Sequence, residues 1–185
     1  MLSRLLRRLN GFSARHPLLW ILSLAALALV WVLTRPDKFG EDGGAPLACA
    51  VSYVADGDTM ELLCDGAKQR VRLHCIDAPE LDQSPWGRAS RNHLRSITPR
   101  RVILIPKPAK HGYRDRFGRT VGEVLVPGED PLSLNIAQVR TGNAAVYSRF
   151  CDEDRYYRTE EIARSARSGI WARSGAHQTP WRYRR

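Results

Sequence analysis

The Asp56-Gly57 pair constrains the fold more than any other feature of the sequence, because Asp-Gly is a strong signal for a tight β-hairpin turn. Hydrophobic and polar residues alternate on both sides of the pair, as expected of two strands with one buried face. Folding the chain at this turn predicts a register in which six residues share one face: Cys49 opposite Cys64, Val51 opposite Leu62, and Tyr53 opposite Met60.

The chain has four cysteines. The hairpin register makes Cys49 and Cys64 cross-strand neighbours, so we expect a disulfide bond between them. Cys75 and Cys151 remain as a second possible pair, although a buried free thiol would explain Cys75 equally well. Disulfide bonds are typical of domains outside the cytoplasm.

Turn signals and hydrophobic periodicity divide the rest of the central region into strands and helices. Ser90, Leu94 and Ile97, for example, have the spacing of one helix face. The sequence predicts strands at 69–76, 102–106 and 120–126, and helices at 87–97, 131–141 and from 152 onward. Together with the hairpin, these elements make an α+β fold, mainly β, with five strands and three helices.

The N-terminal region has a different composition. Residues 18–34 are uncharged and mostly apolar, with tryptophans near both ends, which is typical of a transmembrane helix. A buried soluble helix would rarely be apolar on every face. Four arginines precede the segment, so the rest of the chain is expected across the membrane. We favour an uncleaved signal-anchor over a cleaved signal peptide, because the small residues at 45–50 lie well beyond the apolar segment.

The predicted domain organisation therefore has five parts, and the charge differs between them. A basic N-terminal segment (1–17), a transmembrane signal-anchor (18–34) and a linker (35–46) precede a globular domain (47–172) and a basic disordered tail (173–185). The formal net charge is +10, but five arginines precede residue 36 and four follow residue 172 without any acid, which leaves +1 between them. The basic balance alone therefore does not predict nucleic-acid binding by the globular domain.

Within the stretch 54–80, four carboxylates lie at the connections of predicted strands and one arginine lies on a predicted strand: Asp56, Asp58, Asp77, Glu80 and Arg72. Hydrolysis of a phosphodiester moves negative charge onto the phosphoryl oxygens, so its site needs cations and fixed donors. Arginine binds phosphate oxygens with paired donors, and carboxylates are the ligands that calcium prefers. Each residue also has a simpler explanation, since Asp-Gly is common in turns and Arg119 could pair with Asp115 on the surface.

Four motifs in order resemble the thermonuclease family, the staphylococcal-nuclease-like domains: DGDT (56–59), RLHCIDAPE (72–80), DRFGR (115–119) and GIW (169–171). The resemblance spans about residues 48–172. It implies an OB-type barrel of five strands with three helices. It also implies a calcium-dependent enzyme that cleaves DNA and RNA.

Carried over by position, the resemblance implies that one Ca²⁺ is held by the carboxylates of Asp58 and Asp77 and by the backbone carbonyl of Ala78. Asp56 and Thr59 would support this site, Asp56 through water.

The same resemblance implies catalytic roles for three further residues. Arg72 and Arg119 would contact the scissile phosphate, and Glu80 would be the general base for the attacking water. The loop after Glu80 is short, so the contacts that longer relatives make there are not expected.

Substrate contacts are expected from two other regions. Arg116 and Phe117 stand where the family often has Lys-Tyr, so the charge and the ring remain but the phenol hydroxyl is absent. The aromatic that would stack on a base is Tyr147 or Phe150, and the sequence does not choose between them.

Two classes of function follow. The first is a membrane-anchored, monomeric nuclease whose catalytic domain is extracytoplasmic, or secreted if the N-terminal segment is cleaved, and which acts on DNA or RNA, preferably single-stranded. The second is a non-catalytic nucleic-acid or partner-binding module on the same barrel. The set of Asp58, Asp77, Arg72, Glu80 and Arg119 favours the enzyme, because a binding module has no need of all five.

Overall fold

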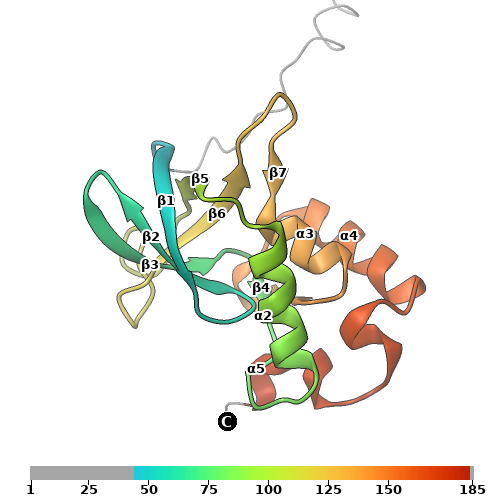
Figure 1. Cartoon of the computed structure of the whole chain (residues 1–185). Coiled ribbons are helices and arrows are strands. Elements are labelled where there is room, and N and C mark those ends of the chain that lie inside the picture. The colour runs from blue at the N-terminus through green and yellow to red at the C-terminus, as the bar shows by residue number, and fades with distance from the viewer. Residues whose placement is uncertain (1–43, 184–185) are drawn as a thin grey trace, which may run out of the picture. The chain divides into compact units, whose positions relative to one another are not determined.

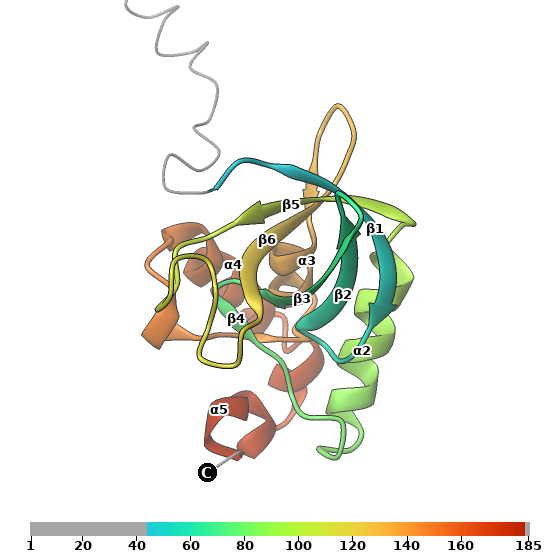
Figure 2. The ribbon, with the colours of Figure 1, turned by 90° about the vertical axis from the view of Figure 1, so that its left-hand side faces the viewer.

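A computed structural model of the chain describes residues 44–183, which lie within one compact unit, Asp42–Arg185. Five strands form a closed barrel in the order β1-β2-β3-β6-β5, with β5 returning to β1 (Figures 1 and 2). Neighbouring strands are antiparallel except for β3 and β6, which are parallel. The barrel strands are β1 (Leu47–Val54), β2 (Thr59–Cys64), β3 (Ala67–Leu73), β5 (Arg101–Pro106) and β6 (Thr120–Val126). This is the expected OB-type barrel.

Helices gather on one side of the barrel (Figure 1). The three expected helices are present as α2 (Trp86–Ile97), α3 (Leu134–Arg140) and α4 (Asp154–Ser165), and a short α5 (Pro180–Tyr183) follows them. Each of α2 and α4 buries residues at helical spacing, such as Tyr156, Glu160 and Ala163 in α4. Small elements complete the unit: β4 (Ile76–Asp77), β7 (Leu132–Ser133), β8 (Ala145–Val146), and the 3₁₀ helices η2 (Ser148–Phe150), η3 (Gly169–Ala172) and η4 (Ala176–Gln178).

One hydrophobic core fills the barrel and continues beneath the helices. Strand residues such as Leu62 and Leu104 are fully buried, and so are Leu94 of α2, Leu134 of α3 and Tyr156 of α4. The helices therefore cover the barrel opening that the strands alone would leave in contact with water.

The predicted hairpin register is confirmed near its open end and wrong near the turn. Cys49 pairs with Cys64 and Val51 with Leu62, but Tyr53 pairs with Glu61 rather than with Met60. A β-bulge adds one residue to β1 between Val51 and Tyr53, and such a bulge moves the following side chains to the opposite face. Tyr53 is consequently exposed, and Val54 takes the buried position opposite Met60.

Two further element boundaries differ from the prediction. The third strand ends at Leu73 rather than at Ile76, because Cys75 has a positive φ of 67° that interrupts the extended chain. The helix expected at 131–141 begins only at Leu134. Leu132–Ser133 instead pair with β6, and the Ser133 hydroxyl caps the helix by accepting a hydrogen bond from the Ile136 amide at 3.2 Å.

Both possible disulfide bonds are present. Cys49–Cys64 joins β1 to β2 as expected, and Cys75–Cys151 joins the break after β3 to the segment before α4. The second bond connects residues 76 positions apart in the sequence, which ties the barrel to the helical side.

The predictions for the N-terminal segment and for the C-terminal tail have different outcomes. The predicted transmembrane segment 18–34 lies outside the described residues, and residues 44–183 contain no helix long and apolar enough to cross a membrane. The tail expected to be disordered is instead ordered as far as Tyr183, where η4 and α5 pack through aromatic side chains.

Candidate active site

The turn between β1 and β2 lies against β4 and α2, and this contact requires glycine. A Cβ atom on Gly57 would lie 1.9 Å from the Ser90 hydroxyl oxygen and 2.6 Å from the Ala78 Cβ. Such distances are far below van der Waals contact, so the close approach depends on the missing side chain. The glycine therefore brings the Asp56–Thr59 motif next to the Asp77–Glu80 motif.

Asp58 and Asp77 converge on one guanidinium group from these two motifs. Arg72, near the end of β3, pairs with Asp58 through Nη1 and with Asp77 through Nη2, and all three side chains are buried. The Asp58 carboxylate also accepts hydrogen bonds from the Ala78 amide at 2.6 Å and from the Thr59 hydroxyl at 3.0 Å. The structure thus brings four of the predicted metal-site residues and one catalytic arginine into direct contact.

Asp56 lies at the edge of this group. Its carboxylate accepts a hydrogen bond from the Asp58 amide at 3.0 Å, which shapes the turn. Burial raises the pKa of Asp56 above its usual value, and the nearby charge of Arg72 and hydrogen bonds with Thr59 oppose that rise. We call Asp56, Asp58, Asp77 and Arg72 the acidic cluster.

The acidic cluster suits a hard divalent cation. Its donor atoms are carboxylate oxygens, with no thiolate or imidazole among them; Asp58 and Asp77 pair with Arg72, and Asp56 lies near the charge of Arg72. Crowded carboxylates at a buried site are stabilised by additional positive charge. Asp58, Asp77 and the Ala78 carbonyl would hold such an ion.

Arg119 reaches the acidic cluster from the loop before β6. Its Nη1 lies 3.5 Å from the Thr59 hydroxyl, and its guanidinium pairs with Asp115 at 2.7 Å. Asp115 also accepts hydrogen bonds from the backbone amides of Phe117 and Arg119. Burial acts to raise the pKa of Asp115, but the hydrogen bonds and charge of Arg119 outweigh it and lower the pKa. Asp115 therefore holds the loop that presents Arg119.

Arg116 and Phe117 lie at the exposed tip of this loop. The Arg116 guanidinium lies 4.6 Å from the centre of the Phe117 ring, and that ring is 67% exposed. Within residues 44–183, neither side chain forms a hydrogen bond or ion pair with the acidic cluster. Both are placed to meet a ligand that approaches Arg119.

Glu80 begins the connection from β4 to α2, and its side chain is half-buried. Its backbone amide donates to the Gln83 side-chain oxygen at 2.8 Å, and a Cβ on Gly87 would lie 1.8 Å from the Glu80 carbonyl oxygen. The first turn of α2 therefore packs directly against Glu80 and fixes its backbone three residues after Asp77.

Tyr147 directly follows β8, whose Ala145 and Val146 pair with Asp77 and Ile76. The Tyr147 amide donates to the Cys75 carbonyl at 2.8 Å. Phe150 packs edge-on against the Tyr147 ring, with centroids 5.0 Å apart, and is 60% exposed. Tyr147 therefore lies next to β4, the strand that carries Asp77. Phe150 is the more exposed of the two aromatic rings.

Gln138 is a site residue that the sequence analysis missed. Its side chain is fully buried on α3 and donates hydrogen bonds to the Gly57 carbonyl at 2.6 Å and to the Ser90 hydroxyl at 3.2 Å. His93 lies 2.5 Å from its side-chain oxygen. Gln138 therefore ties the turn of the acidic cluster to α2 and α3. No local motif signals this role, because its partners lie 45 to 81 residues away.

A second group of charged side chains comes from the ends of β3 and β5, from β6 and from the start of α4. Glu153 accepts from His74 and from Lys107, each at 3.2 Å, and Arg155 pairs at 2.6 Å with both Glu153 and Glu123. The hydrogen bond with His74 lowers the pKa of Glu153 to about 2. We call Glu123, Glu153, His74, Lys107 and Arg155 the mixed cluster.

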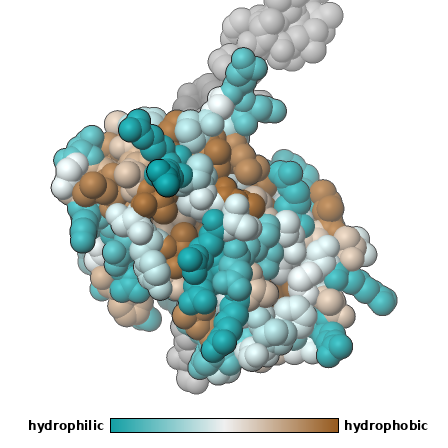
Figure 3. Space-filling view, in the orientation of Figure 1, coloured by the Kyte–Doolittle hydropathy of each residue, from teal (hydrophilic) through white to brown (hydrophobic). Residues whose placement is uncertain are grey.

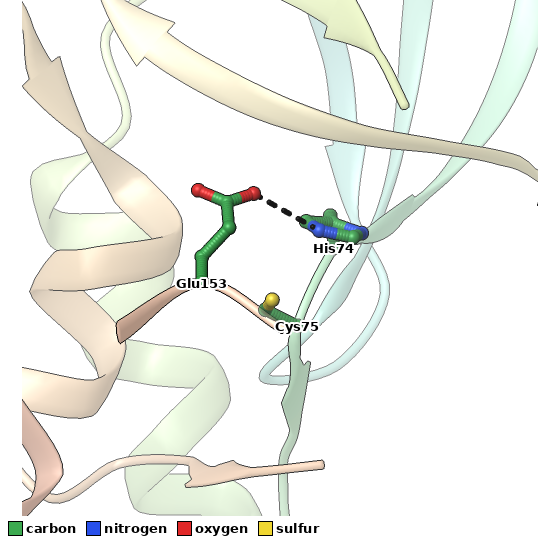
Figure 4. A group of neighbouring side chains, drawn as sticks. All are labelled: His74, Cys75 and Glu153. Atoms are coloured by element: carbon green, nitrogen blue, oxygen red, sulfur yellow. Dashed lines mark ion pairs between the residues drawn. The ribbon is translucent and has the colours of Figure 1, made fainter. Parts of the chain in front are cut away.

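The mixed cluster is not a metal site. Ligand atoms of His74, Cys75 and Glu153 lie within 4.8 Å of one another (Figure 4). The Cys75 sulfur is bonded to Cys151, and Glu153 already pairs with Lys107, with Arg155 and with the His74 imidazole. A disulfide sulfur is not a thiolate ligand, so this cluster stabilises the fold.

The face shown in Figure 3 carries both hydrophobic and hydrophilic side chains. Hydrophobic side chains form separate small patches, and hydrophilic side chains prevail over α2 and α5. A polar ligand can therefore approach these helices without displacing a large apolar partner.

Comparison with known proteins supports the family resemblance of the sequence motifs. The family model described as staphylococcal nuclease homologue matches residues 70–173. Protein ParB of Escherichia coli is 35% identical over 174 residues, covering 89% of this chain and 91% of the relative. A micrococcal nuclease of Shigella flexneri is 34% identical over 143 residues, covering 73% and 79%. An uncharacterized endonuclease of Escherichia coli O157:H7 is 33% identical over 148 residues, covering 76% and 91%.

The closed barrel and its buried cluster of carboxylates and arginine define a nuclease of the phosphodiesterase class. The chain belongs to the staphylococcal nuclease homologue family. The resemblance in the four sequence motifs is thereby confirmed.

Proposed function

We propose that this protein is a membrane-anchored, calcium-dependent nuclease that hydrolyses DNA or RNA, preferably single-stranded, outside the cytoplasm. The observation that carries the catalytic part of this proposal is the buried contact of Arg72 with both Asp58 and Asp77. It joins a phosphate-binding side chain to an oxygen-donor site for a cation.

In this proposal Asp58, Asp77 and the Ala78 carbonyl hold one calcium ion. When bound, the ion supplies positive charge that stabilises the negative charge developing on the phosphoryl oxygens. Asp56 and Thr59 support the turn through their hydrogen bonds with Asp58.

In the reaction, different side chains have different roles. Glu80 accepts a proton from the attacking water, whose oxygen forms the new bond to phosphorus. The bond to the leaving oxygen breaks, and that oxygen keeps the electron pair and takes a proton from solvent. Arg72 and Arg119 donate to the non-bridging oxygens, which gain charge in the transition state. Arg116 and Phe117 contact the substrate further along, because their exposed loop also carries Arg119.

The decisive experiment measures cleavage of single-stranded DNA by the purified full chain in detergent, with calcium and then with a chelator. We expect calcium-dependent product, and a loss of roughly 10²–10⁴-fold in rate for Glu80→Gln. Glu161→Gln is the matched control, because Glu161 is an exposed carboxylate on α4. A cleavage rate that the chelator does not lower, or a Glu80→Gln rate equal to that of the control, rejects the mechanism.

The cellular location is a separate part of the proposal. Two disulfide bonds support an oxidising compartment, and the arginines before the apolar residues 18–34 support a transmembrane anchor. We expect the chain to resist alkaline extraction from membranes and a chain lacking residues 18–34 to be soluble. Added protease should reach residues 44–185 only from the extracytoplasmic side.

We further propose that the catalytic unit works as a monomer, since every proposed site residue comes from one chain. Size measurement in detergent tests this, and a dimer at working concentration would contradict it.

A further inference from the structure

The C-terminal segment contacts both borders of the proposed active site. The ring of Trp181 on α5 stacks on the ring of Tyr147, with centroids 5.1 Å apart and 10° between the planes. Two residues later, the Tyr183 hydroxyl donates to the Asp82 carboxylate at 3.1 Å. Asp82 lies two residues after Glu80, so α5 connects the two segments that adjoin the acidic cluster.

The position of Trp181 is held by buried contacts rather than by the surface alone. Trp181 packs against a second hydrophobic cluster that includes Ala145 and Trp171, and Pro180 beside it is buried. In the preceding 3₁₀ helix, His177 stacks on Trp86 with centroids 4.5 Å apart. A segment anchored in this way is a fixed part of the site, because swinging aside would expose all of these contacts.

The surroundings of the stacked pair suit a base and its phosphates. Trp181 and Tyr147 are both only half-buried, and the exposed Phe150 extends the aromatic surface. Arg149 lies 5.5 Å from the centre of the Phe150 ring, and Arg182 is exposed next to Trp181. Aromatic faces interspersed with arginines bind single-stranded nucleic acid by stacking and by phosphate contacts.

We propose that Trp181 adds a second aromatic ring to the nucleobase-binding subsite expected at Tyr147, and that this ring stacks on a base adjoining the phosphodiester to be cleaved. This inference rests on the proposed nuclease function. It makes the C-terminal segment a determinant of substrate affinity, and it gives Tyr147 a partner that fixes the orientation of its ring.

Binding of a fluorescent single-stranded oligonucleotide tests the subsite apart from catalysis. The measurement uses the full chain with calcium in a Glu80→Gln background, so that the oligonucleotide stays intact. We expect Trp181→Leu, which keeps an apolar side chain but no ring, to bind roughly tenfold more weakly. Trp181→Phe is the matched variant and should retain most of the affinity. Circular dichroism and melting temperature establish that both variants are folded.

An abasic oligonucleotide identifies the ligand group. Replacing the base beside the cleaved bond should weaken binding to the chain that keeps Trp181 roughly tenfold, and the Trp181→Leu variant should discriminate far less between the two oligonucleotides. Equal affinities of the parent chain and the Trp181→Leu variant for the intact oligonucleotide would overturn the proposal. Faster cleavage by Trp181→Leu in an otherwise unaltered chain would also overturn it, because Trp181 would then cover the site.

Photocrosslinking gives an answer that needs no variant. A single-stranded oligonucleotide with 5-iodouracil beside the cleaved bond should crosslink to Trp181 of the wild-type chain. A crosslink map without Trp181 contradicts the proposal. If binding and crosslinks appear as expected but wild-type protein shows no calcium-dependent cleavage, the nuclease mechanism fails and the base-binding subsite stands.

Discussion

The acidic cluster and the mixed cluster each include a residue at the end of β3, Arg72 and His74, yet their charge balance differs. In the acidic cluster, Arg72 pairs with Asp58 and Asp77, and the Asp56 carboxylate also lies near its charge. In the mixed cluster, Glu153 and Glu123 meet Lys107, Arg155 and His74. The mixed cluster therefore balances its charges internally, whereas the acidic cluster has an excess of negative charge that suits a cation.

This difference separates a structural site from a functional one. Balanced, hydrogen-bonded charges can be buried with little further demand on their surroundings, and the mixed cluster uses them to join the barrel to α4. Clustered carboxylates are costly without a counter-charge, so they are kept where a ligand supplies one. Cys75 directly follows His74 of the mixed cluster and lies two residues before Asp77 of the acidic cluster.

Removing the two disulfide bonds separately should have the largest effect on stability. Replacing Cys75 and Cys151 by alanine should lower the free energy of unfolding by about 4 kcal/mol, and replacing Cys49 and Cys64 by about 3 kcal/mol. The first bond closes the longer loop, 76 against 15 residues. Urea unfolding measures both values. A larger loss for the hairpin bond would show that Cys75–Cys151 does not tie the two regions together.

Exchanging arginine for lysine in each cluster tests whether their roles are distinct. Arg72→Lys should lower kcat roughly 100-fold, because lysine cannot present two planar donors to a phosphate. Arg155→Lys should leave kcat within about twofold and lower the melting temperature, since Arg155 only pairs with Glu123 and Glu153. Comparable losses of kcat in both variants would show that the two clusters do not differ in function.

Gln138→Leu should affect both stability and the acidic cluster. The change leaves the buried Gly57 carbonyl without its 2.6 Å hydrogen bond and should cost about 2 kcal/mol of unfolding free energy. It should also raise the calcium concentration needed for half-maximal activity, because the turn bearing Asp58 loses its support. Gln69→Leu is the control, since Gln69 accepts a hydrogen bond from Thr120. A calcium requirement unchanged in Gln138→Leu would restrict Gln138 to a structural role.

Lowering the pH should weaken the mixed cluster. The folded-state pKa of Glu153 is about 2 against an ordinary value of 4.5, so its contribution to stability is present above about pH 4.5 and is lost as the pH falls towards 2. The loss should be about 1 kcal/mol, because water screens the partly exposed carboxylate. Glu153→Gln should flatten this part of the stability curve relative to the wild-type chain. Parallel curves for the two proteins would contradict the assignment.

Sequence motifs located most of the candidate site because its key residues lie in two short, ordered segments. Asp58, Asp77 and Arg72 were all predicted and are in contact. Arg119 was predicted as well, and its pairing with Asp115 coexists with its contact with Thr59. Gln138 and Trp181 were not predicted, because their partners are remote in the sequence and neither belongs to a motif.

Local chemistry was thus enough for the Asp-Gly turn, the pairing of Cys49 with Cys64, and the spacing of the three main helices, since each depends on neighbouring residues. The other features of the structure depend on closure of the barrel and on the helices that cover it. The bulge that turns Tyr53 outward arises as β1 bends between two partner strands. The Cys75–Cys151 bond and the Trp181–Tyr147 stack join segments that come together only when the helices cover the barrel. Such contacts depend on the path of the whole chain, which no single segment encodes.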